Sequence, residues 1–167
     1  VRALGRCVEK GLVYKGKKPV YWCISDRTAL AEAEVEYASH TSPSIYVEFT
    51  LDPRDADALA ARVPGVAGRV VSVLIWTTTP WTIPSNLALA FQPGFDYAGY
   101  DVDGRLVIVA AALAEATFGK AGRAPGTPVA RMKGEVFDRI RFVHPLYGRG
   151  SLGVLADYVT LEQGTGV

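Results

Sequence analysis

Four threonines lie within six residues of this sequence, three of them between two tryptophans and the fourth directly after the second. Three of them, Thr77 to Thr79, follow an apolar run, and Thr82 comes directly after Trp81. Hydroxyl groups both donate and accept hydrogen bonds. A cluster of them therefore suits a carboxyl ester, ribose oxygens or a water molecule better than it suits an apolar core. An ordinary exposed strand edge is the alternative interpretation, because threonine is a good strand former.

The backbone around these threonines is restricted by two prolines, Pro80 and Pro84. Each removes a backbone donor and favours an extended conformation of the residue before it. Successive strand residues face opposite sides, so the outer two residues of the threonine triplet should share one face and the middle one should take the other. We therefore expect a stiff curve that turns several hydroxyls and the amide of Asn86 towards one space.

The elements that position this segment follow from the hydrophobic pattern. Helical spacing of apolar residues predicts helices at 1–14, 52–63 and 111–119. Residues 28–37 fit either a helix or a strand. Apolar runs, alternating or continuous, predict strands at 19–25, 45–51, 69–76 and 87–91, a hairpin at 97–110, and further strands within 128–146 and 153–167. The prediction is an α+β fold that is mainly β, as a β-barrel-like or strongly bent sheet with a few peripheral helices.

Composition gives weaker constraints. The 167 residues suit one domain, and a net charge of +1 does not point to a polyanionic partner unless the charge is local. There is no signal peptide or membrane-spanning apolar run, so we expect a cytoplasmic protein with no membrane partner. The sequence starts without methionine and stops at Gly-Thr-Gly-Val, which we interpret as a domain excised from a longer protein.

Residues 74–91, LIWTTTPWTIPSNLALAF, resemble the threonine-rich segment of the editing domain of class I aminoacyl-tRNA synthetases, in its isoleucyl form. The flanking words KPVYWC, TALAEAEVEYASHTSPSIYVEF and LADYVTLEQGTGV agree and run in family order across nearly the whole chain. The resemblance implies a helix or linker to the parent synthetase core at 1–18 and an editing domain at 19–167. That domain would be truncated at its C-terminal end, because the family's histidine and aspartate after the Gly-Thr-Gly turn are missing here.

The resemblance also implies a function. The domain would hydrolyse valine wrongly attached to the tRNA for isoleucine, or valyl-adenylate, in a second site that excludes isoleucine by size. Its partners would be the 3′ end of that tRNA, the mischarged amino acid and the parent catalytic core, and it would need no cofactor. Carried over by position, the catalytic residues are Thr78 and Thr79, and the substrate-binding residues are Thr77, Trp81, Thr82, Asn86, Gly164, Thr165 and Gly166.

Several alternatives stay open. Trp81 could form a wall of the site or fill the core, and Asp157 could replace the missing carboxylate, although a turn residue is the preferred interpretation. Without the downstream histidine and aspartate, the domain could bind an aminoacyl nucleotide or a tRNA end without cleaving it. A structural insertion that packs against a neighbouring domain is a third hypothesis.

The other reactive residue types give less signal. His40 and His144 are the only histidines and lie in no nucleophile motif, so we interpret both as surface or packing residues. Cys23 has Asp26 three positions later, where relatives often carry a second cysteine, so we expect a small buried hydrophobe and no zinc site. The basic residues at 2–18 could touch phosphates, but a solvated linker is the preferred interpretation.

Overall fold

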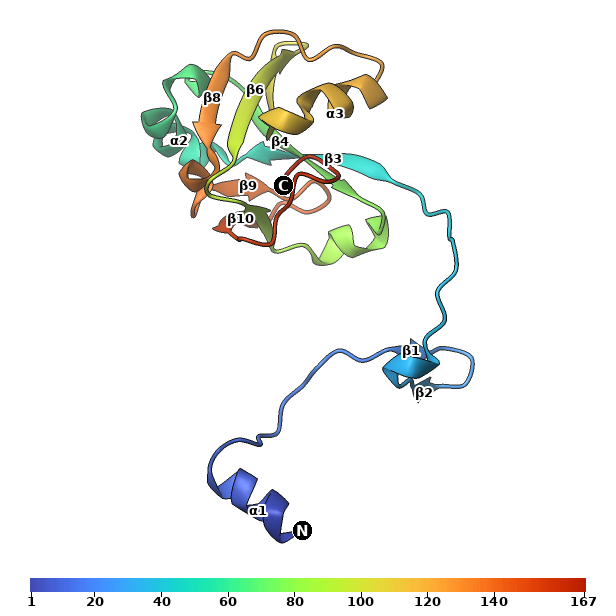
Figure 1. Cartoon of the computed structure of the whole chain (residues 1–167). Coiled ribbons are helices and arrows are strands. Elements are labelled where there is room, and N and C mark those ends of the chain that lie inside the picture. Colours follow the sequence, from blue (N-terminus) through green and yellow to red (C-terminus); the bar gives the residue numbers. More distant parts are fainter. The chain divides into compact units, whose positions relative to one another are not determined.

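The structure, a computed structural model, describes residues 1–167 and separates into two compact units, Val1–Thr41 and Ser42–Val167 (Figure 1). None of the helices in either unit has the length and apolar composition needed to cross a membrane.

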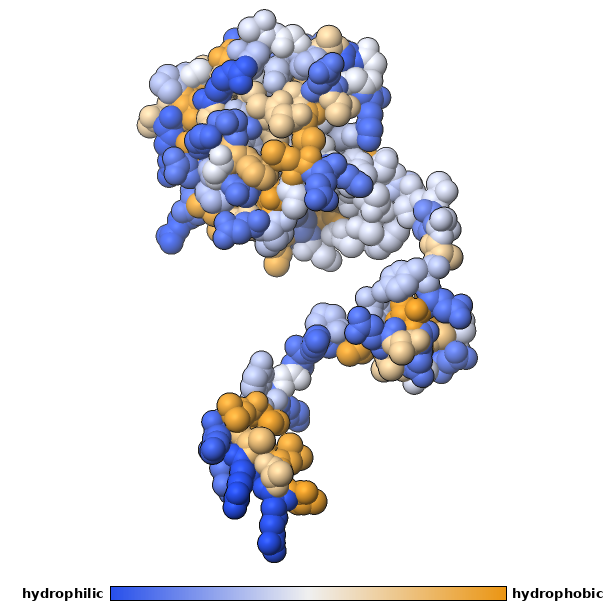
Figure 2. All heavy atoms as spheres, in the orientation of Figure 1, coloured by the Kyte–Doolittle hydropathy of each residue, from blue (hydrophilic) through white to orange (hydrophobic).

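The first unit contains helix α1 (Arg2–Glu9), a hairpin of β1 (Trp22–Cys23) and β2 (Thr28–Ala29), and the 3-10 helix η1 (Glu32–Glu34). The helix predicted at 1–14 is confirmed only over Arg2–Glu9, and Figure 2 shows its apolar and basic residues on different sides. Of the strand predicted at 19–25, only the two residues of β1, Trp22 and Cys23, are in a strand. Residues 28–37 form neither of the two expected elements over their full length, because a short strand and one helical turn divide them.

Cys23 is half-exposed in this unit, so the prediction of a buried hydrophobe is wrong. Its Sγ donates to Asp26 Oδ2 at 3.2 Å and accepts from the Asp26 N–H at 3.4 Å. The hairpin is too small to enclose a side chain, so the thiol is held by the turn instead of by a core.

The second unit is built on one eight-stranded sheet. Its strand order is β5-β10-β9-β3-β4-β7-β6-β8, and neighbours are antiparallel except for the parallel pairs β5–β10 and β4–β7. The strands are β3 (Ile45–Leu51), β4 (Val71–Thr77), β5 (Ala88–Phe91), β6 (Asp96–Val102), β7 (Arg105–Ala110), β8 (Ala130–Lys133), β9 (Arg141–Val143) and β10 (Gly150–Leu155).

The prediction of a mainly β, α+β fold is confirmed. Strand β4 lies between β3 and β7 and is buried along most of its length, as its continuous apolar run predicts. Strands β5 and β8 are the two edges of the sheet and have no ladder to each other, so a closed barrel is not found. The barrel-like arrangement stays a prediction.

Short helices follow β3 and β7. Helix α2 (Ala56–Arg62) continues from the 3-10 turn η2 (Pro53–Asp55), and α3 (Ala114–Lys120) continues from η5 (Ala111–Leu113), so both predicted helices are confirmed. Asp52 caps η2 by accepting from the Arg54 N–H at 3.0 Å. Two further 3-10 turns are η3 (Pro64–Val66) and η6 (Gly134–Phe137).

The hairpin predicted at 97–110 is β6 and β7. Its turn residues Asp103 and Gly104 both have positive φ, 52° and 83°, the geometry that a two-residue hairpin turn favours. Alternate hairpin residues face two apolar clusters. On one face, Tyr97 joins the main core beside the stacked rings of Phe91 and Phe137, whose centroids are 4.4 Å apart. On the other, Tyr100 packs under α3.

The strand prediction for residues 153–167 is only partly right. Strand β10 ends at Leu155, and the residues after it form turns in which Gly164 and Gly166 have φ of 82° and 79°. Only glycine adopts this region readily. The Gly-Thr-Gly word therefore sets a turn and not a strand.

Candidate functional site

The threonine segment leaves the sheet at the end of β4 and enters the 3-10 helix η4 (Pro80–Ser85). Thr79 Oγ1 lies 3.2 Å from Thr77 Oγ1 and 3.5 Å from Thr82 Oγ1. The Thr82 hydroxyl also donates to the Thr79 carbonyl oxygen at 2.8 Å. The structure therefore brings three of the four threonine hydroxyls into one hydrogen-bonded group, called here the threonine cluster (Thr77, Thr79 and Thr82).

Thr78 is half-buried and takes part in none of these hydrogen bonds. Thr77 and Thr79 are grouped as expected, but β4 ends at Thr77, so a local turn and not strand alternation brings them together. The Thr78 hydroxyl is thus separated from the cluster that its neighbours form.

Trp81 has 67% of its surface exposed, so the alternative of a core tryptophan is wrong. It is the second residue of the 3-10 helix η4, directly after Pro80. The role of this indole as a wall of the site stays a prediction.

Asn86 ends η4 and is tied to its surroundings by both ends of its amide. Its Oδ1 accepts from Ser151 Oγ at 2.6 Å, and its Nδ2 donates to the Ala88 carbonyl oxygen at 2.8 Å. These bonds fix the amide to strand β10 and to the start of β5. The side chain is therefore part of the framework of the segment.

A hollow of about 210 Å³ opens beside the threonine cluster. A second hollow of about 220 Å³ contains the Gly-Thr-Gly turn at 164–166, and the two share Trp76, Ala90 and Val167. The first is lined by Ile75, Trp76, Thr77, Thr82, Ile83, Asn86, Ala88, Leu89, Ala90 and Val167. The structure thus brings the two predicted substrate-binding segments, more than seventy positions apart in the sequence, to adjacent hollows.

The Gly-Thr-Gly turn is held by its backbone. The Ala110 N–H donates to the Thr165 carbonyl oxygen at 2.8 Å, and the buried Tyr97 hydroxyl donates to the Gly166 carbonyl oxygen at 2.6 Å. Burial raises the pKa of Tyr97 to about 12. The hydroxyl is therefore a stable donor across the neutral range. A Cβ on Gly166 would meet Ala110 Cβ, so the turn needs glycine there.

Two buried side-chain atoms in the chain have no hydrogen-bond partner, and both belong to residues that line the second hollow. They are Trp76 Nε1 and Thr165 Oγ1. Buried polar groups are nearly always paired, so unpaired ones need an explanation such as a ligand. Sequence reasoning assigned Trp76 no role in the site, although its place directly before the threonine triplet was the available signal.

No charged side chain lines either hollow. Asp157 lies in a turn, is exposed and lines neither of them, which confirms its interpretation as a turn residue. The donors and acceptors at these hollows are neutral hydroxyls and amides. Such a lining suits an uncharged ester or sugar better than a phosphate.

The two histidines lie in different surroundings. His40 is exposed in the first unit. His144 is 2% exposed and directs its Nε2 to the Ile83 carbonyl oxygen at 2.8 Å, so it is a packing residue with a specific hydrogen bond. No group of three or more His, Cys, Asp or Glu side chains is arranged to hold a metal ion.

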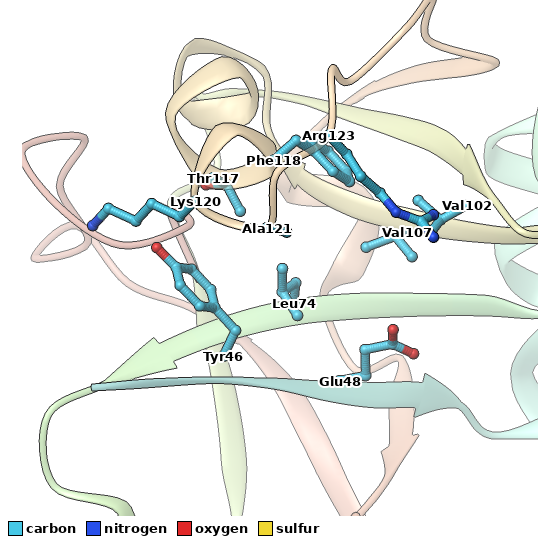
Figure 3. A pocket seen from close by; sticks show the side chains of 10 residues that line it. All are labelled: Tyr46, Glu48, Leu74, Val102, Val107, Thr117, Phe118, Lys120, Ala121 and Arg123. Atoms are coloured by element: carbon cyan, nitrogen blue, oxygen red, sulfur yellow. The ribbon is translucent and has the colours of Figure 1, made fainter. Parts of the chain in front are cut away.

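A separate hollow of about 260 Å³ lies between α3 and the sheet (Figure 3). Leu74, Val107 and Phe118 give it an apolar lining, and its charged rim is partly paired, since Glu48 accepts from Arg105 at 2.8 Å. None of the threonine cluster lines it. It is therefore distinct from the site that the sequence predicts.

Comparisons with known proteins point to one family. The model of tRNA synthetases class I (I, L, M and V) matches residues 1–144. The chain is 49% identical over 165 residues to an isoleucine–tRNA ligase of Geobacter sulfurreducens and 48% identical over 168 residues to one of Laribacter hongkongensis. These matches cover 99% and 100% of this chain but only 17% and 18% of the relatives.

Solved structures agree at the level of the fold. The chain is similar to GlLeuRS-CP1, with a TM-score of 0.62 at 16% identity, over 74% of this chain and 53% of that one. It is also similar to the P. knowlesi cytosolic leucyl-tRNA synthetase editing domain, with a TM-score of 0.58 at 11% identity, over 77% of this chain and 58% of that one. The mainly β architecture is thus shared with these two domains.

Proposed function

Because the chain belongs to the family of class I tRNA synthetases (I, L, M and V), we propose that it forms the editing domain of an isoleucine–tRNA ligase. In this role it hydrolyses the ester that joins valine to the tRNA for isoleucine, or the corresponding valyl-adenylate. The chain spans about 17% of the length of the first relatives, so the parent catalytic core and the tRNA are proposed partners.

The observation that carries the proposal is the threonine cluster at the edge of a neutral hollow. Three hydroxyl oxygens lie within 3.5 Å of a neighbour in the cluster. Each hydroxyl can donate one hydrogen bond and accept others, and Thr82 already donates to the Thr79 carbonyl oxygen. In this arrangement the cluster therefore offers acceptors, which can hold the hydrogens of a water molecule. Apolar side chains such as Ile75 and Leu89 complete the lining and suit a branched aliphatic side chain.

The proposed reaction uses water as the nucleophile. A water oxygen held by threonine hydroxyls attacks the ester carbonyl carbon, and the bond from that carbon to the ribose oxygen breaks. The ribose oxygen takes up the proton that the water loses, giving free valine and free tRNA. Positioning of the two reactants can lower the activation barrier of such a reaction by on the order of several kcal/mol. Hydrolysis of an ester consumes only water, so the proposal needs no cofactor.

Discrimination by size explains why a second site would exist. One missing methylene is worth only about 1–3 kcal/mol in an apolar pocket, and the isoleucine–valine pair is itself the usual illustration of that limit. A site that admits valine and excludes isoleucine removes the errors that remain. In this proposal the hollow beside the threonine cluster is that site. Trp81 is not among the residues that line the hollow, so a wall formed by its exposed indole would lie at the outside of the site.

The test is deacylation of valyl-tRNA for isoleucine by the intact ligase that carries this chain. Replacing Thr79 by arginine fills the cluster and should abolish deacylation while aminoacylation continues. Thr127, which is exposed and lines none of the hollows described here, provides the matched control Thr127→Arg. Deacylation that is equally fast in both variants would refute the proposal.

A binding module that does not cleave is the second candidate. It is supported by the lining of the two hollows, which contains no histidine, cysteine, serine or carboxylate. A non-hydrolysable valyl-adenosine analogue distinguishes the two candidates. Binding of the analogue with no turnover of valyl-tRNA supports the binding module, and turnover excludes it.

A further inference from the structure

The segment that carries the threonines is held from the side by residues that follow β9. His144, Tyr147 and Arg149, called here the carbonyl clamp, come from the loop between β9 and β10, and two of them donate to backbone carbonyl oxygens of residues 83–86. The partners are about sixty positions away in the sequence. The clamp therefore fixes one segment against another in a way that local structure cannot.

His144 forms the buried half of the clamp. Its Nδ1 accepts from the backbone N–H groups of Leu146 and Tyr147 at 3.1 and 3.2 Å. Since those groups only donate, Nε2 carries the ring proton and donates to the Ile83 carbonyl oxygen at 2.8 Å. The ring also packs edge-on against Phe49 of the core, with centroids 6.0 Å apart. The imidazole thus connects the core, its own loop and η4.

Arg149 forms the exposed half. Its Nη2 donates to the carbonyl oxygens of Pro84 and Asn86 at 2.6 and 2.8 Å. Tyr147 lies between the two halves, because its ring stacks on His144 at 5.1 Å and the guanidinium carbon of Arg149 lies 5.4 Å from its centroid. The stack orders the guanidinium, which would otherwise be a mobile surface group.

Segment 80–86 needs such support because its own backbone is poor in donors. Pro80 and Pro84 have no N–H, and within the 3-10 helix only Ile83 is buried. The Ser151 hydroxyl adds a fourth contact by donating to Asn86 Oδ1 at 2.6 Å. Four side-chain hydrogen bonds from residues 144–151 therefore anchor residues 83–86, which directly follow Thr82 of the threonine cluster.

We propose that His144 and Arg149 are positioning residues for the threonine site. They touch no substrate; by holding the carbonyls of residues 83–86 they set where the Thr82 hydroxyl lies relative to Thr79. The proposal rests on the proposed hydrolysis and extends it with residues that no threonine motif contains. Loss of the clamp should lower the hydrolytic rate constant more than substrate binding, because misplacement of catalytic groups acts on the reaction step.

The central experiment compares Arg149→Met with Arg62→Met in the intact ligase. Arg62 is a matched control, since its Nη1 also donates to two carbonyl oxygens, those of Val136 and Asp138, away from the threonines. Single-turnover deacylation of valyl-tRNA should be about tenfold or more slower in Arg149→Met, with little change in the half-saturating concentration, and unchanged in Arg62→Met.

Two substitutions of His144 test its two hydrogen-bonding functions one at a time: acceptance from the loop N–H groups at Nδ1 and donation to the Ile83 carbonyl oxygen at Nε2. In His144→Asn, the amide oxygen takes the place of Nδ1 and serves the loop, but the donor to Ile83 is lost. In His144→Gln, the longer amide reaches Ile83 and should restore part of the rate that His144→Asn loses. If both His144 variants fail to fold, the comparison of Arg149→Met with Arg62→Met still decides the proposal, because both arginines are exposed.

Amide hydrogen exchange gives a readout that does not depend on activity. The Asn86 N–H bonds to the Ile83 carbonyl oxygen at 2.9 Å, and its exchange should be faster in Arg149→Met than in Arg62→Met. Equal deacylation rates in the two arginine variants overturn the positioning role. If the unmodified ligase does not hydrolyse valyl-tRNA, the proposed function fails separately. Exchange of the Asn86 N–H then tests the clamp alone: faster exchange in Arg149→Met than in Arg62→Met supports the clamp, and equal exchange overturns it.

Discussion

The hydroxyl oxygen of Thr77 accepts a hydrogen bond from the backbone N–H of Thr79 at 3.0 Å, and the two side-chain oxygens lie 3.2 Å apart. This contact closes the end of β4 into a small turn before Pro80. The first residue of the triplet therefore sets the conformation of the third.

Replacing Thr77 by valine should disturb this turn and the threonine cluster together. Valine keeps the shape but leaves the Thr79 N–H without its acceptor, so under the proposed function we expect deacylation of valyl-tRNA to fall by about 100-fold, the effect of a small misplacement of catalytic groups. Thr50→Val is the control, because that hydroxyl also lies near another, Ser72 Oγ at 3.4 Å, but far along the sheet. An equal effect of both substitutions would contradict the prediction.

The Gly166→Ala substitution should destabilise the fold and displace the Gly-Thr-Gly turn. It combines a positive φ of 79° with a clash against Ala110. Gly68→Ala is the control, since Gly68 has a φ of 70° and open space around its Cβ position. We expect Gly166→Ala to lower the free energy of unfolding by about 1–3 kcal/mol more than the control, measured by urea denaturation.

The Thr165→Val substitution should not destabilise the fold, although Thr165 is buried. Its hydroxyl has no partner, and an unpaired buried hydroxyl costs about 1–3 kcal/mol, so valine should leave the free energy of unfolding equal or higher. Under the proposed function, the variant should nevertheless deacylate valyl-tRNA more slowly, because the Thr165 hydroxyl that it lacks would contact the substrate. Thr117→Val is the control: that buried hydroxyl donates to the Gly164 carbonyl oxygen at 3.4 Å, so its loss should cost stability.

The Tyr97→Phe substitution should leave the Gly166 carbonyl oxygen without its donor and lower the free energy of unfolding by about 1–3 kcal/mol, as measured by urea denaturation. Burial raises the pKa of Tyr97 from its ordinary value of 10.0 to about 12. A raised folded-state pKa gives stability that is complete below pH 10 and is lost as the pH rises towards 12. Thermal unfolding between pH 9 and 12 should therefore show a steeper loss of Tm in the unmodified protein than in Tyr97→Phe.

Acid should destabilise the second unit through Asp52. Hydrogen bonds from the Arg54 side chain, and then from its backbone N–H, lower the pKa of Asp52 from 3.8 to about 2. A lowered folded-state pKa gives stability that is present above the ordinary value and is lost as the pH falls through the folded one. Tm should therefore fall between pH 4 and pH 2 less steeply in Asp52→Asn than in the unmodified protein. Asp57→Asn, at an exposed residue of α2 that forms no ion pair, should follow the unmodified protein.

Local features of this protein could be read from its sequence because they depend on neighbouring residues. Alternation predicted β3 with the observed bounds Ile45–Leu51, and the Asp-Gly turn predicted the β6–β7 hairpin. Thr77 and Thr79 come together as predicted, although through a local turn after the end of β4 in which the Thr79 N–H donates to the Thr77 hydroxyl oxygen. The membership of the synthetase family was also available, since the threonine segment and its flanking words carry it.

Other features were decided only by contacts between distant segments. Parallel pairing of β10 with β5 brings the chain after residue 150 beside residues 88–91, and so places the Gly-Thr-Gly turn next to the threonine cluster. His144 gave no signal in the sequence because its partner, the Ile83 carbonyl oxygen, is a backbone atom that every residue possesses. Side-chain types and spacing thus determined which residues could do chemistry. Long-range strand pairing and core packing determined which of them meet, because those contacts depend on the sum of many interactions and not on any local pattern.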